Sequence, residues 1–306
     1  MCCLFGIHDY GRSLTRKQKH KLLSSLAVAS EVRGTDATGI AYNDADKLTI
    51  HKRPWPAHLV RFKVPDDASV VMGHTRMTTQ GDEKHNYNNH PFAGRVNGED
   101  FALAHNGVLY NDRSIRNELR LPPTPVETDS YVAVQLIEQS GELSFDSLKD
   151  MAETVEGQFT FTVLSERDEM YFVRGDNPMC IYHYPKRGLY VYASTEAILR
   201  DAIQRLPFYL GRYQKVDLGC GEILRIDAVG HLSRVDFHFR SSFYDPWIWR
   251  TPRPYSYTIE DADDEYLQEL KVIAAFYGYS PEDVEMMLAE GFTTDEIEEL
   301  IYCGEM

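Results

Sequence analysis

A cysteine stands at the second position of the chain, in the opening Met1-Cys2-Cys3-Leu4-Phe5-Gly6. If the initiator methionine is removed, as the small neighbouring side chain favours, Cys2 carries a thiol and a free α-amine on one residue. The reference pKa of an α-amine lies close to neutrality, so this amine can act as a base toward the thiol. Cys2 would then supply both nucleophile and base. The alternative is that Cys2 and Cys3 open a buried strand as small apolar residues, since free cysteine is often buried.

Other polar residues of reactive types stand in short stretches far from Cys2 along the chain. These stretches are Gly73-His74-Thr75-Arg76, His105-Asn106-Gly107 and Thr128-Asp129. Each has an ordinary structural interpretation: Arg76 as a surface ion pair, Asn106-Gly107 as a hairpin turn, and Asp129 as a helix N-cap. Whether they act together with Cys2 depends on the elements that position them.

Hydrophobic spacing predicts a helix over residues 16–32, capped by Ser13 or Thr15, after the opening strand. Short apolar runs separated by brief turns predict antiparallel sheet. The segment 82–98, rich in Asn, Gly and His, is predicted to be a long loop. The expected strands are 40–42, 48–52, 69–73, 101–104, 160–164, 170–174, 179–183, 189–193 and 222–226, and the later helices are 130–138, 145–155 and 194–203.

Composition narrows the class of protein. The 306 residues contain no basic-then-apolar leader and no long uncharged apolar run, so we expect neither secretion nor a membrane span. The five cysteines are scattered and form no C-x-x-C pair, which argues against a disulfide framework or a metal site. A reducing cytoplasm fits this pattern and would keep a catalytic thiol usable.

The net charge of −15 lies almost wholly at the C-terminal end. Residues 259–306 hold 15 acidic residues and one basic residue, Lys271, which leaves 32 acidic and 31 basic residues in the rest of the chain. An acidic end repels nucleic acid, so we expect no nucleic-acid partner. We expect a body over 2–240, a proline- and aromatic-bearing linker over 241–258, and an acidic helical tail over 259–306.

The tail contains a short repeat. The stretch Gly278-Tyr279-Ser280-Pro281-Glu282-Asp283-Val284 resembles Gly291-Phe292-Thr293-Thr294-Asp295-Glu296-Ile297, and each reads as a turn, an N-cap, an acidic first turn and an apolar helix face. With a preceding helix over 267–277, this predicts three short helices. Acidic residues at helix starts favour the macrodipole, so the charge has a structural explanation, and a docking face for a basic partner is the alternative.

Six stretches, in order, resemble class II glutamine amidotransferases, which are N-terminal nucleophile hydrolases. Residues 2–6 resemble the family's Cys-Gly-Ile-x-Gly, and the three polar stretches resemble its Gly-His-Thr-Arg, His-Asn-Gly and Thr-Asp motifs. The loop 33–39 and Asn89-His90-Pro91 match further landmarks. The likeness is greatest to the glutaminase domain of glucosamine-6-phosphate synthase and covers residues 2–240. It implies an α+β fold, a four-layer αββα sandwich of two mainly antiparallel sheets.

The resemblance also implies roles. L-glutamine would be bound by Arg76 at its α-carboxylate and by Asp129 at its α-ammonium, with Thr79 matching a glutamine-contacting threonine. Cys2 would attack the side-chain amide, and Asn106 and the Gly107 N–H would stabilise the oxyanion. Hydrolysis of the γ-glutamyl thioester would then give glutamate and ammonia. No cofactor and no metal are implied.

The sequence departs from the family at two places. The glycine that follows the family nucleophile is Cys3 here, and a family histidine is Gln80. We expect a stand-alone amidotransferase, because the tail is too short for a known acceptor domain, and we expect it to pass ammonia to a separate synthase subunit. The alternatives are cleavage of another small γ-glutamyl or amide substrate, and a non-catalytic glutamine-binding sensor or scaffold subunit, which Cys3 and Gln80 keep open.

Overall fold

The computed structural model describes residues 2–45 and 47–239, and beyond them 267, 270, 271, 274, 279–290, 292, 297, 300 and 301. The chain separates into two compact units, residues 1–244 and 245–306. The predicted linker over 241–258 lies outside the described residues. In the described part of the chain, no helix is long and apolar enough to cross a membrane.

Two sheets form the centre of the first unit, and every neighbouring pair of strands in them is antiparallel. The seven-stranded sheet has the order β11 (Gln214–Val216), β9 (Cys180–Tyr184), β10 (Leu189–Ala193), β1 (Cys3–His8), β4 (Val70–Arg76), β2 (Ala37–Asp44) and β3 (Lys47–Arg53). The six-stranded sheet has the order β13 (Leu232–Asp236), β12 (Glu222–Ile226), β8 (Met170–Arg174), β7 (Gly157–Ser165), β6 (Glu99–Leu109) and β5 (Phe92–Val96).

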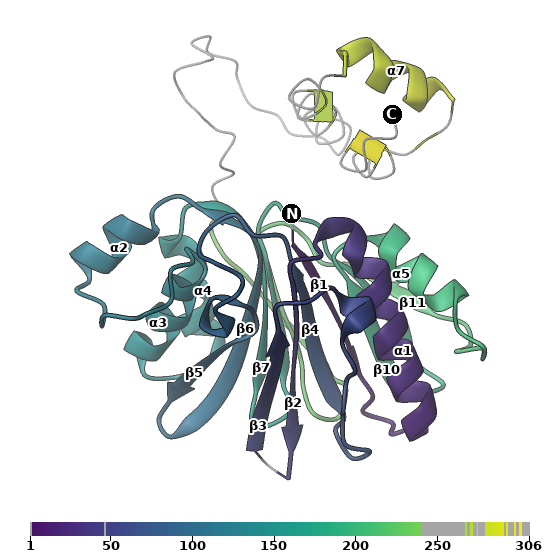
Figure 1. Ribbon diagram of the computed structural model, residues 1–306, viewed down its shortest axis with the longest axis horizontal. Helices are drawn as coiled ribbons and strands as arrows, with labels where there is room; N and C mark the ends of the chain where they lie inside the picture. Colours follow the sequence, from purple (N-terminus) through teal and green to yellow (C-terminus); the bar gives the residue numbers. More distant parts are fainter. Residues whose placement is uncertain are drawn as a thin grey trace. The chain divides into compact units, whose positions relative to one another are not determined.

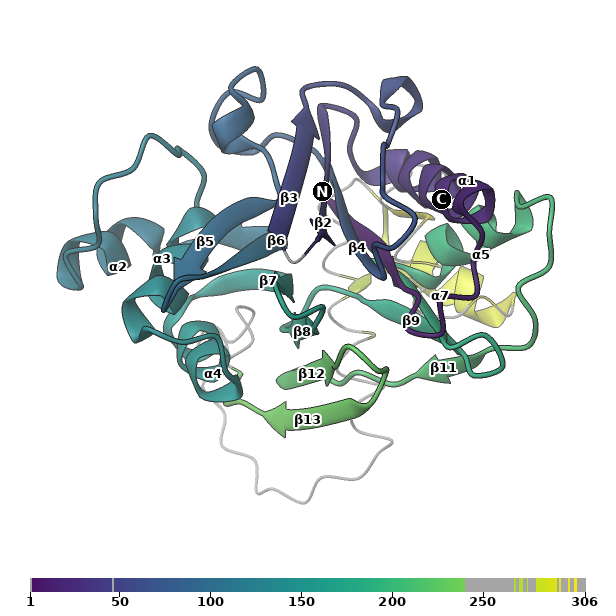
Figure 2. The same ribbon diagram turned by 90° about the horizontal axis from the view of Figure 1, so that it is seen from below.

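Helices cover the outer faces of both sheets (Figure 1). They are α1 (Arg16–Ala29) and α5 (Glu196–Gln204) on the seven-stranded sheet, with α3 (Tyr131–Ser140), α4 (Phe145–Thr154) and the short α2 (Asp112–Glu118) on the side of the six-stranded sheet. Figure 2 shows the two sheets stacked with the helices outside them. The predicted four-layer αββα sandwich is therefore confirmed.

Buried apolar side chains form a separate core in each gap between layers. Leu22, Leu26 and Leu199 pack under the first helical layer, Met72 and Phe172 lie between the sheets, and Ile137, Leu148 and Phe161 lie under the second helical layer. Side chains alternate across a strand, so β1 contributes to two cores. Cys3, Phe5 and Ile7 belong to the first, whereas Leu4 belongs to the core between the sheets.

The predicted first helix is confirmed with a change at its end. Thr15 caps α1 through a reciprocal hydrogen-bond pair with Gln18, and Ser13 does not. The α-helix ends at Ala29 and continues as a 3₁₀ turn, η1 (Ser30–Arg33). A second such turn is η2 (Ala57–Leu59).

The prediction of a long loop over 82–98 was wrong. That segment contains a 3₁₀ turn, η3 (Asn86–Asn88), and the strand β5. Its Asn, Gly and His content concealed a short alternating run, in which Phe92, Gly94 and Val96 are buried and the residues between them are exposed. The helix α2 and the strands β11 and β13 were not predicted.

The second unit is described only in part. Ser280 caps α7 (Pro281–Ala289) through a reciprocal pair with Asp283, as the repeat predicts. Val284 and Ile297, which occupy matching positions of the repeat, are both buried, with Leu270, Ala274 and Ile301 in the same small core. The predicted helix over 267–277 falls mostly on residues outside the described set.

Candidate active site

Cys2 directly precedes β1, at the end of the seven-stranded sheet where β4 finishes. Cys3 pairs with Thr75, so Cys2 stands across from Arg76. The half-buried Cys2 donates a hydrogen bond from Sγ to the Met77 carbonyl at 3.5 Å, and Arg33 Nε donates to the Cys2 carbonyl at 3.2 Å. Burial raises the pKa of the Cys2 thiol, and the charge of Arg76 only partly opposes this. The sulfur therefore keeps its proton near neutral pH, and its ionisation would need a base.

Alternation along β1 separates the two cysteines. Cys3 is fully buried in the core beneath α1 and α5, whereas Leu4, on the opposite face, points between the sheets. Cys2 shares the face of Leu4 by the same period. Cys3 therefore lies on the opposite face of β1 from the Cys2 side chain and does not crowd it.

Arg76 is the last residue of β4, and the residue is 3% exposed. Nη1 donates to Asn89 Oδ1 at 2.7 Å, and Nη2 donates to the carbonyls of Gln80 and, at 3.5 Å, Gly81. Burial lowers the pKa of Arg76, and the nearby Cys2 and Glu83 raise it. The surface ion-pair interpretation of Arg76 is wrong, because the group is enclosed.

The segment 33–39 supports the end of β4. Asp36 donates its N–H to the Arg76 carbonyl at 2.9 Å, and its carboxylate accepts from the Thr78 N–H at 2.7 Å. A Cβ at Gly34 would stand 2.4 Å from the Arg76 carbonyl carbon, so only glycine allows this approach. Thr79 follows on an exposed stretch of the loop. Gln80 contributes its backbone carbonyl to Arg76, whatever its side chain does.

Asn106 and Gly107 lie inside β6, paired with Thr160 and Phe159 of β7. The hairpin-turn interpretation is therefore wrong. The Asn106 carbonyl accepts from Asn177 Nδ2 at 2.9 Å, but its side-chain Nδ2 and Oδ1 are buried with no hydrogen-bond partner among the described residues. Gly107 has φ 143°, and a Cβ there would stand 1.9 Å from the Gln158 carbonyl oxygen. Glycine is thus required at this position.

Asp129 is buried beside the end of β6. One carboxylate oxygen accepts from the Leu109 N–H at 2.6 Å, and the other accepts from the Ser130 hydroxyl at 3.3 Å. The helix α3 begins after Ser130 without a side-chain cap, so Asp129 is not its N-cap residue. The carboxylate instead joins the start of α3 to the end of β6.

The two sheets meet at this end of the sandwich through buried histidines. His74 Nε2 lies 3.0 Å from the His105 carbonyl oxygen, which links β4 to β6 two residues before Arg76 and one before Asn106. Burial lowers the pKa of His74 to about 3 and lowers that of His105, so both rings stay neutral. The fold therefore brings Arg76 and Asn106 to the same end of the body, and the charges of Arg76 and Asp129 both act on the pKa of Cys2.

Two residues at this end had no signal in the sequence. Asn177 holds the Asn106 carbonyl from the turn after β8, and Lys52 donates to the Asn89 carbonyl at 2.7 Å from β3. Each acts across a large separation along the chain, and neither stands in a recognisable motif. Structure alone finds them.

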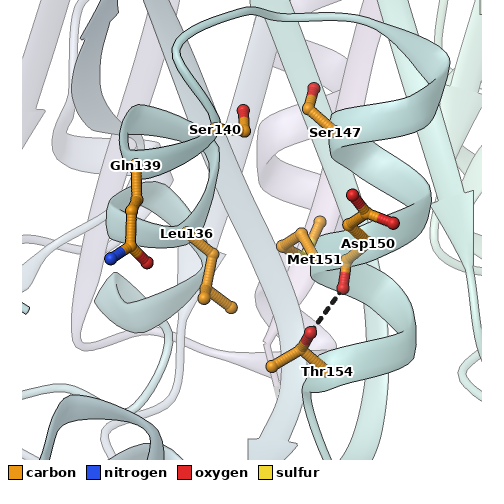
Figure 3. Close-up of a pocket in the computed structure, with 7 residues that line it drawn as sticks. All are labelled: Leu136, Gln139, Ser140, Ser147, Asp150, Met151 and Thr154. Carbon is orange, nitrogen blue, oxygen red and sulfur yellow. Dashed lines mark hydrogen bonds between the residues drawn. The ribbon is translucent and has the colours of Figure 1, made fainter. Parts of the chain in front are cut away.

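A depression between α3 and α4 lies away from the site around Cys2 (Figure 3). It is lined by Leu136, Gln139, Ser140, Ser147, Asp150, Met151 and Thr154, and the Thr154 hydroxyl donates to the Asp150 carbonyl at 2.6 Å. These residues come from α4 and from the second half of α3, away from the end that follows Asp129. The depression takes no part in the site around Cys2.

Known proteins match both the sequence and the fold. A family model described as "Glutamine amidotransferase domain" matches residues 62–210. The chain is 30% identical over 190 residues to glutamine–fructose-6-phosphate aminotransferase (isomerizing) of Sulfurisphaera tokodaii, covering 59% of this chain and 31% of that protein. It is 33% identical over 140 residues to the protein of the same name from Chlamydia muridarum, covering 44% and 22%.

The chain contains a glutamine amidotransferase domain of the class II type. Among solved structures, the glutamine phosphoribosylpyrophosphate amidotransferase of B. subtilis matches this amidotransferase fold with a TM-score of 0.60 at 25% identity, over 78% of this chain and 50% of that one. An allosteric regulatory enzyme of purine biosynthesis matches with a TM-score of 0.62 at 23% identity, which supports the fold alone. The chain spans less than a third of the length of the curated relatives given above.

Proposed function

We propose that this amidotransferase domain hydrolyses L-glutamine to glutamate and ammonia through a thioester on Cys2. The observation that carries the proposal is the side-chain amide of Asn106 beside Gly107. This amide is buried with no partner among the described residues, at the end of the body where Cys2 precedes β1. A buried amide without a partner costs about 1–3 kcal/mol, so its retention indicates a ligand or a transient charge.

Glutamine binding would use groups at the ends of both sheets. Arg76 would take the α-carboxylate and Asp129 the α-ammonium, with Thr79 at the exposed rim. These contacts fix the amino-acid end and direct the side-chain amide toward the Cys2 sulfur. Free asparagine is one methylene shorter than glutamine, so its side-chain amide carbon would not reach the Cys2 sulfur.

Attack transfers the thiol proton to the α-amine of Cys2 and forms a carbon–sulfur bond. The carbonyl oxygen becomes an oxyanion, which would accept hydrogen bonds from Asn106 Nδ2 and the Gly107 N–H. One such donor contributes about 3 kcal/mol of transition-state stabilisation. The carbon–nitrogen bond then breaks as the leaving nitrogen takes the proton from the Cys2 ammonium, and ammonia departs. Water attacks the thioester, and glutamate leaves with the thiol restored.

We further propose that the domain covers 2–240 and passes ammonia to a separate synthase, for which the acidic segment 259–306 is the candidate docking element. The charge of that segment supports a basic partner surface. Affinity purification of the full chain from its own cells tests this. Recovery of a synthase that is lost when 259–306 is removed is expected, and recovery of no stable complex would count against it.

The test of the reaction is ammonia release from L-glutamine by the purified chain, beside a Cys2→Ala control. Intact mass establishes whether Met1 has been removed. Turnover that disappears in the control is the expected result. A processed N-terminus with glutamine binding and no turnover would favour the glutamine-sensor alternative, and competition by glutamine analogues separates glutamine from other γ-glutamyl substrates.

A further inference from the structure

The orientation of Arg76 is set by residues that do not belong to its own strand. Its Nη1 donates to the side-chain oxygen of Asn89 at 2.7 Å, and Asn89 is itself fully buried. The Asn89 amide nitrogen donates in turn to the Glu83 carbonyl at 2.7 Å. The Asn89 side chain therefore has a single orientation, with its oxygen toward Arg76 and its nitrogen toward the loop.

Lys52 fixes the backbone at the same residue. Its ammonium donates to the Asn89 carbonyl at 2.7 Å and lies 5.3 Å from the centroid of the Phe92 ring. Lys52 belongs to β3 and Phe92 to β5, and these are edge strands of the two different sheets. One side chain thus spans the two sheet edges and ends at the residue that holds Arg76.

The backbone that follows Asn89 is also in close contact with β2. A Cβ at Gly39 would stand 2.1 Å from the His90 carbonyl oxygen, so β2 packs directly on the backbone after Asn89. The half-buried Lys52 keeps a charge near the Arg76 charge, and burial with that repulsion lowers the pKa of Lys52 to about 8. A like charge at this place is costly, and it is retained because the Asn89 carbonyl and the Phe92 ring both stabilise it.

We propose that Lys52 is a positioning residue for glutamine binding, which sets the direction of the Arg76 guanidinium through Asn89. The proposal rests on the proposed function, in which Arg76 takes the α-carboxylate of glutamine. Lys52 touches no substrate. Its removal frees the Asn89 backbone, and the Arg76 fork then loses the fixed direction that two parallel hydrogen bonds to a carboxylate need.

The consequence should fall on binding and not on chemistry. Cys2 lies just before β1, and Asn106 and Gly107 lie in β6. In the described part of the chain, none of the three makes a hydrogen bond to Lys52 or Asn89. Lys52→Met keeps the length of the stem but removes the donor. We expect it to raise KM for glutamine about tenfold with kcat within about twofold, a change typical of coupled neighbours.

The experiment compares four proteins by ammonia release: the native chain, Lys52→Met, Lys52→Arg and Lys47→Met. Lys47 stands at the exposed start of the same strand and serves as the matched control. Alkylation of Cys2 by iodoacetamide, a small neutral reagent with no α-carboxylate, reports whether the thiol is intact. Lys52→Arg should recover most of the affinity, because arginine can also donate to the Asn89 carbonyl, and Lys47→Met should match the native chain.

The outcomes separate this proposal from the reaction itself. An unchanged KM in Lys52→Met, or a fall in kcat and alkylation rate without a change in KM, would overturn the role of Lys52. If the native chain shows no turnover, the proposed reaction fails, and calorimetric binding of glutamine to the same four proteins decides the positioning role. Weaker binding by Lys52→Met alone supports that role, and equal binding by all four, or binding by none, overturns it.

Discussion

Two groups proposed to hold the substrate differ in what they contact in the structure. The guanidinium of Arg76 has acceptors in Asn89, Gln80 and Gly81. The amide of Asn106 is as deeply buried and has no partner among the described residues. On one side of the site the group is already hydrogen-bonded to the protein, and on the other side a donor and an acceptor are open.

The difference follows from the kind of charge that each group meets. A permanent cation cannot be buried without partners, because the cost is several kcal/mol. A neutral amide can remain unpaired at about 1–3 kcal/mol. A group that binds a stable carboxylate is therefore held in advance by the protein, and a group that meets a charge only in the transition state is left free for it.

Asn106→Ala tests the free side and should have the largest effect. We expect kcat to fall about 10²- to 10³-fold with little change in KM, since the donor acts only on the oxyanion. Because the amide has no partner among the described residues, the free energy of unfolding should not fall by the usual cost of a lost hydrogen bond. Ammonia-release kinetics and urea unfolding measure the two quantities.

Asn88→Ala is the matched contrast. Asn88 is equally buried, but its amide donates to Glu127 at 2.7 Å and to the Asp82 carbonyl at 3.1 Å. Its removal should lower the free energy of unfolding by about 1–3 kcal/mol. Similar losses of stability in Asn88→Ala and Asn106→Ala would contradict the distinction between a hydrogen-bonded amide and an unpaired one.

Arg76→Lys tests the side of the site at which the guanidinium is held by the protein. A lysine keeps the charge but cannot form the two parallel hydrogen bonds, so KM for glutamine should rise about 10- to 100-fold with a smaller change in kcat. The rate of Cys2 alkylation by iodoacetamide should stay within about twofold of the native rate. A large fall in kcat at unchanged KM would mean that Arg76 serves the transition state instead.

His8→Phe tests whether a buried side chain away from the site is also kept neutral in the folded protein. Burial lowers the pKa of His8 to about 4, against about 6.5 for an unperturbed histidine. Between these values the unfolded chain binds a proton that the folded chain does not, so stability is complete above about pH 6.5 and is lost as the pH falls toward 4.

The substitution should therefore reduce the loss of unfolding free energy between pH 7 and pH 5 by up to about 2 kcal/mol. Urea unfolding at the two pH values measures it, and kcat at pH 7 should match the native value. An unchanged pH dependence would show that His8 is not the group that titrates.

Cys3→Ala gives the smallest expected effect and tests which face of β1 the site uses. The substitution removes a buried sulfur beneath α1 and α5, so it should cost about 1 kcal/mol of stability. The kinetic constants and the yield of Cys2 alkylation should not change. A strong loss of kcat would place Cys3 on the same side as the nucleophile.

The sequence predicts the residues of the site better than their surroundings. Cys2, Arg76, Asn106 and Asp129 stand in short local sequence stretches, so residue type and order are enough to select them. The layered fold follows from the resemblance to class II glutamine amidotransferases, and the short apolar runs predict its antiparallel sheets. Their proposed roles remain predictions until kinetics are measured.

The supports of these residues escaped prediction because they act over long separations. Lys52 donates to the Asn89 carbonyl from β3, 37 residues earlier in the chain. Asn177 donates to the Asn106 carbonyl from the turn after β8, 71 residues later in the chain. Asn106-Gly107 has the local composition of a tight turn, yet pairing with β7 keeps it extended, so tertiary context overrides local preference. The strand β5 was missed because a polar segment surrounds five residues of alternating burial.

The division of β1 between two cores also constrains how this chain can change over evolutionary time. Positions 3, 5 and 7 share their volume with helical neighbours, and position 4 shares its volume with the second sheet. Compensating substitutions for adjacent positions must therefore arise in different layers of the fold. Covariation along β1 should follow alternate residues, so that the helical layers can diverge while the face that continues from Cys2 stays unchanged.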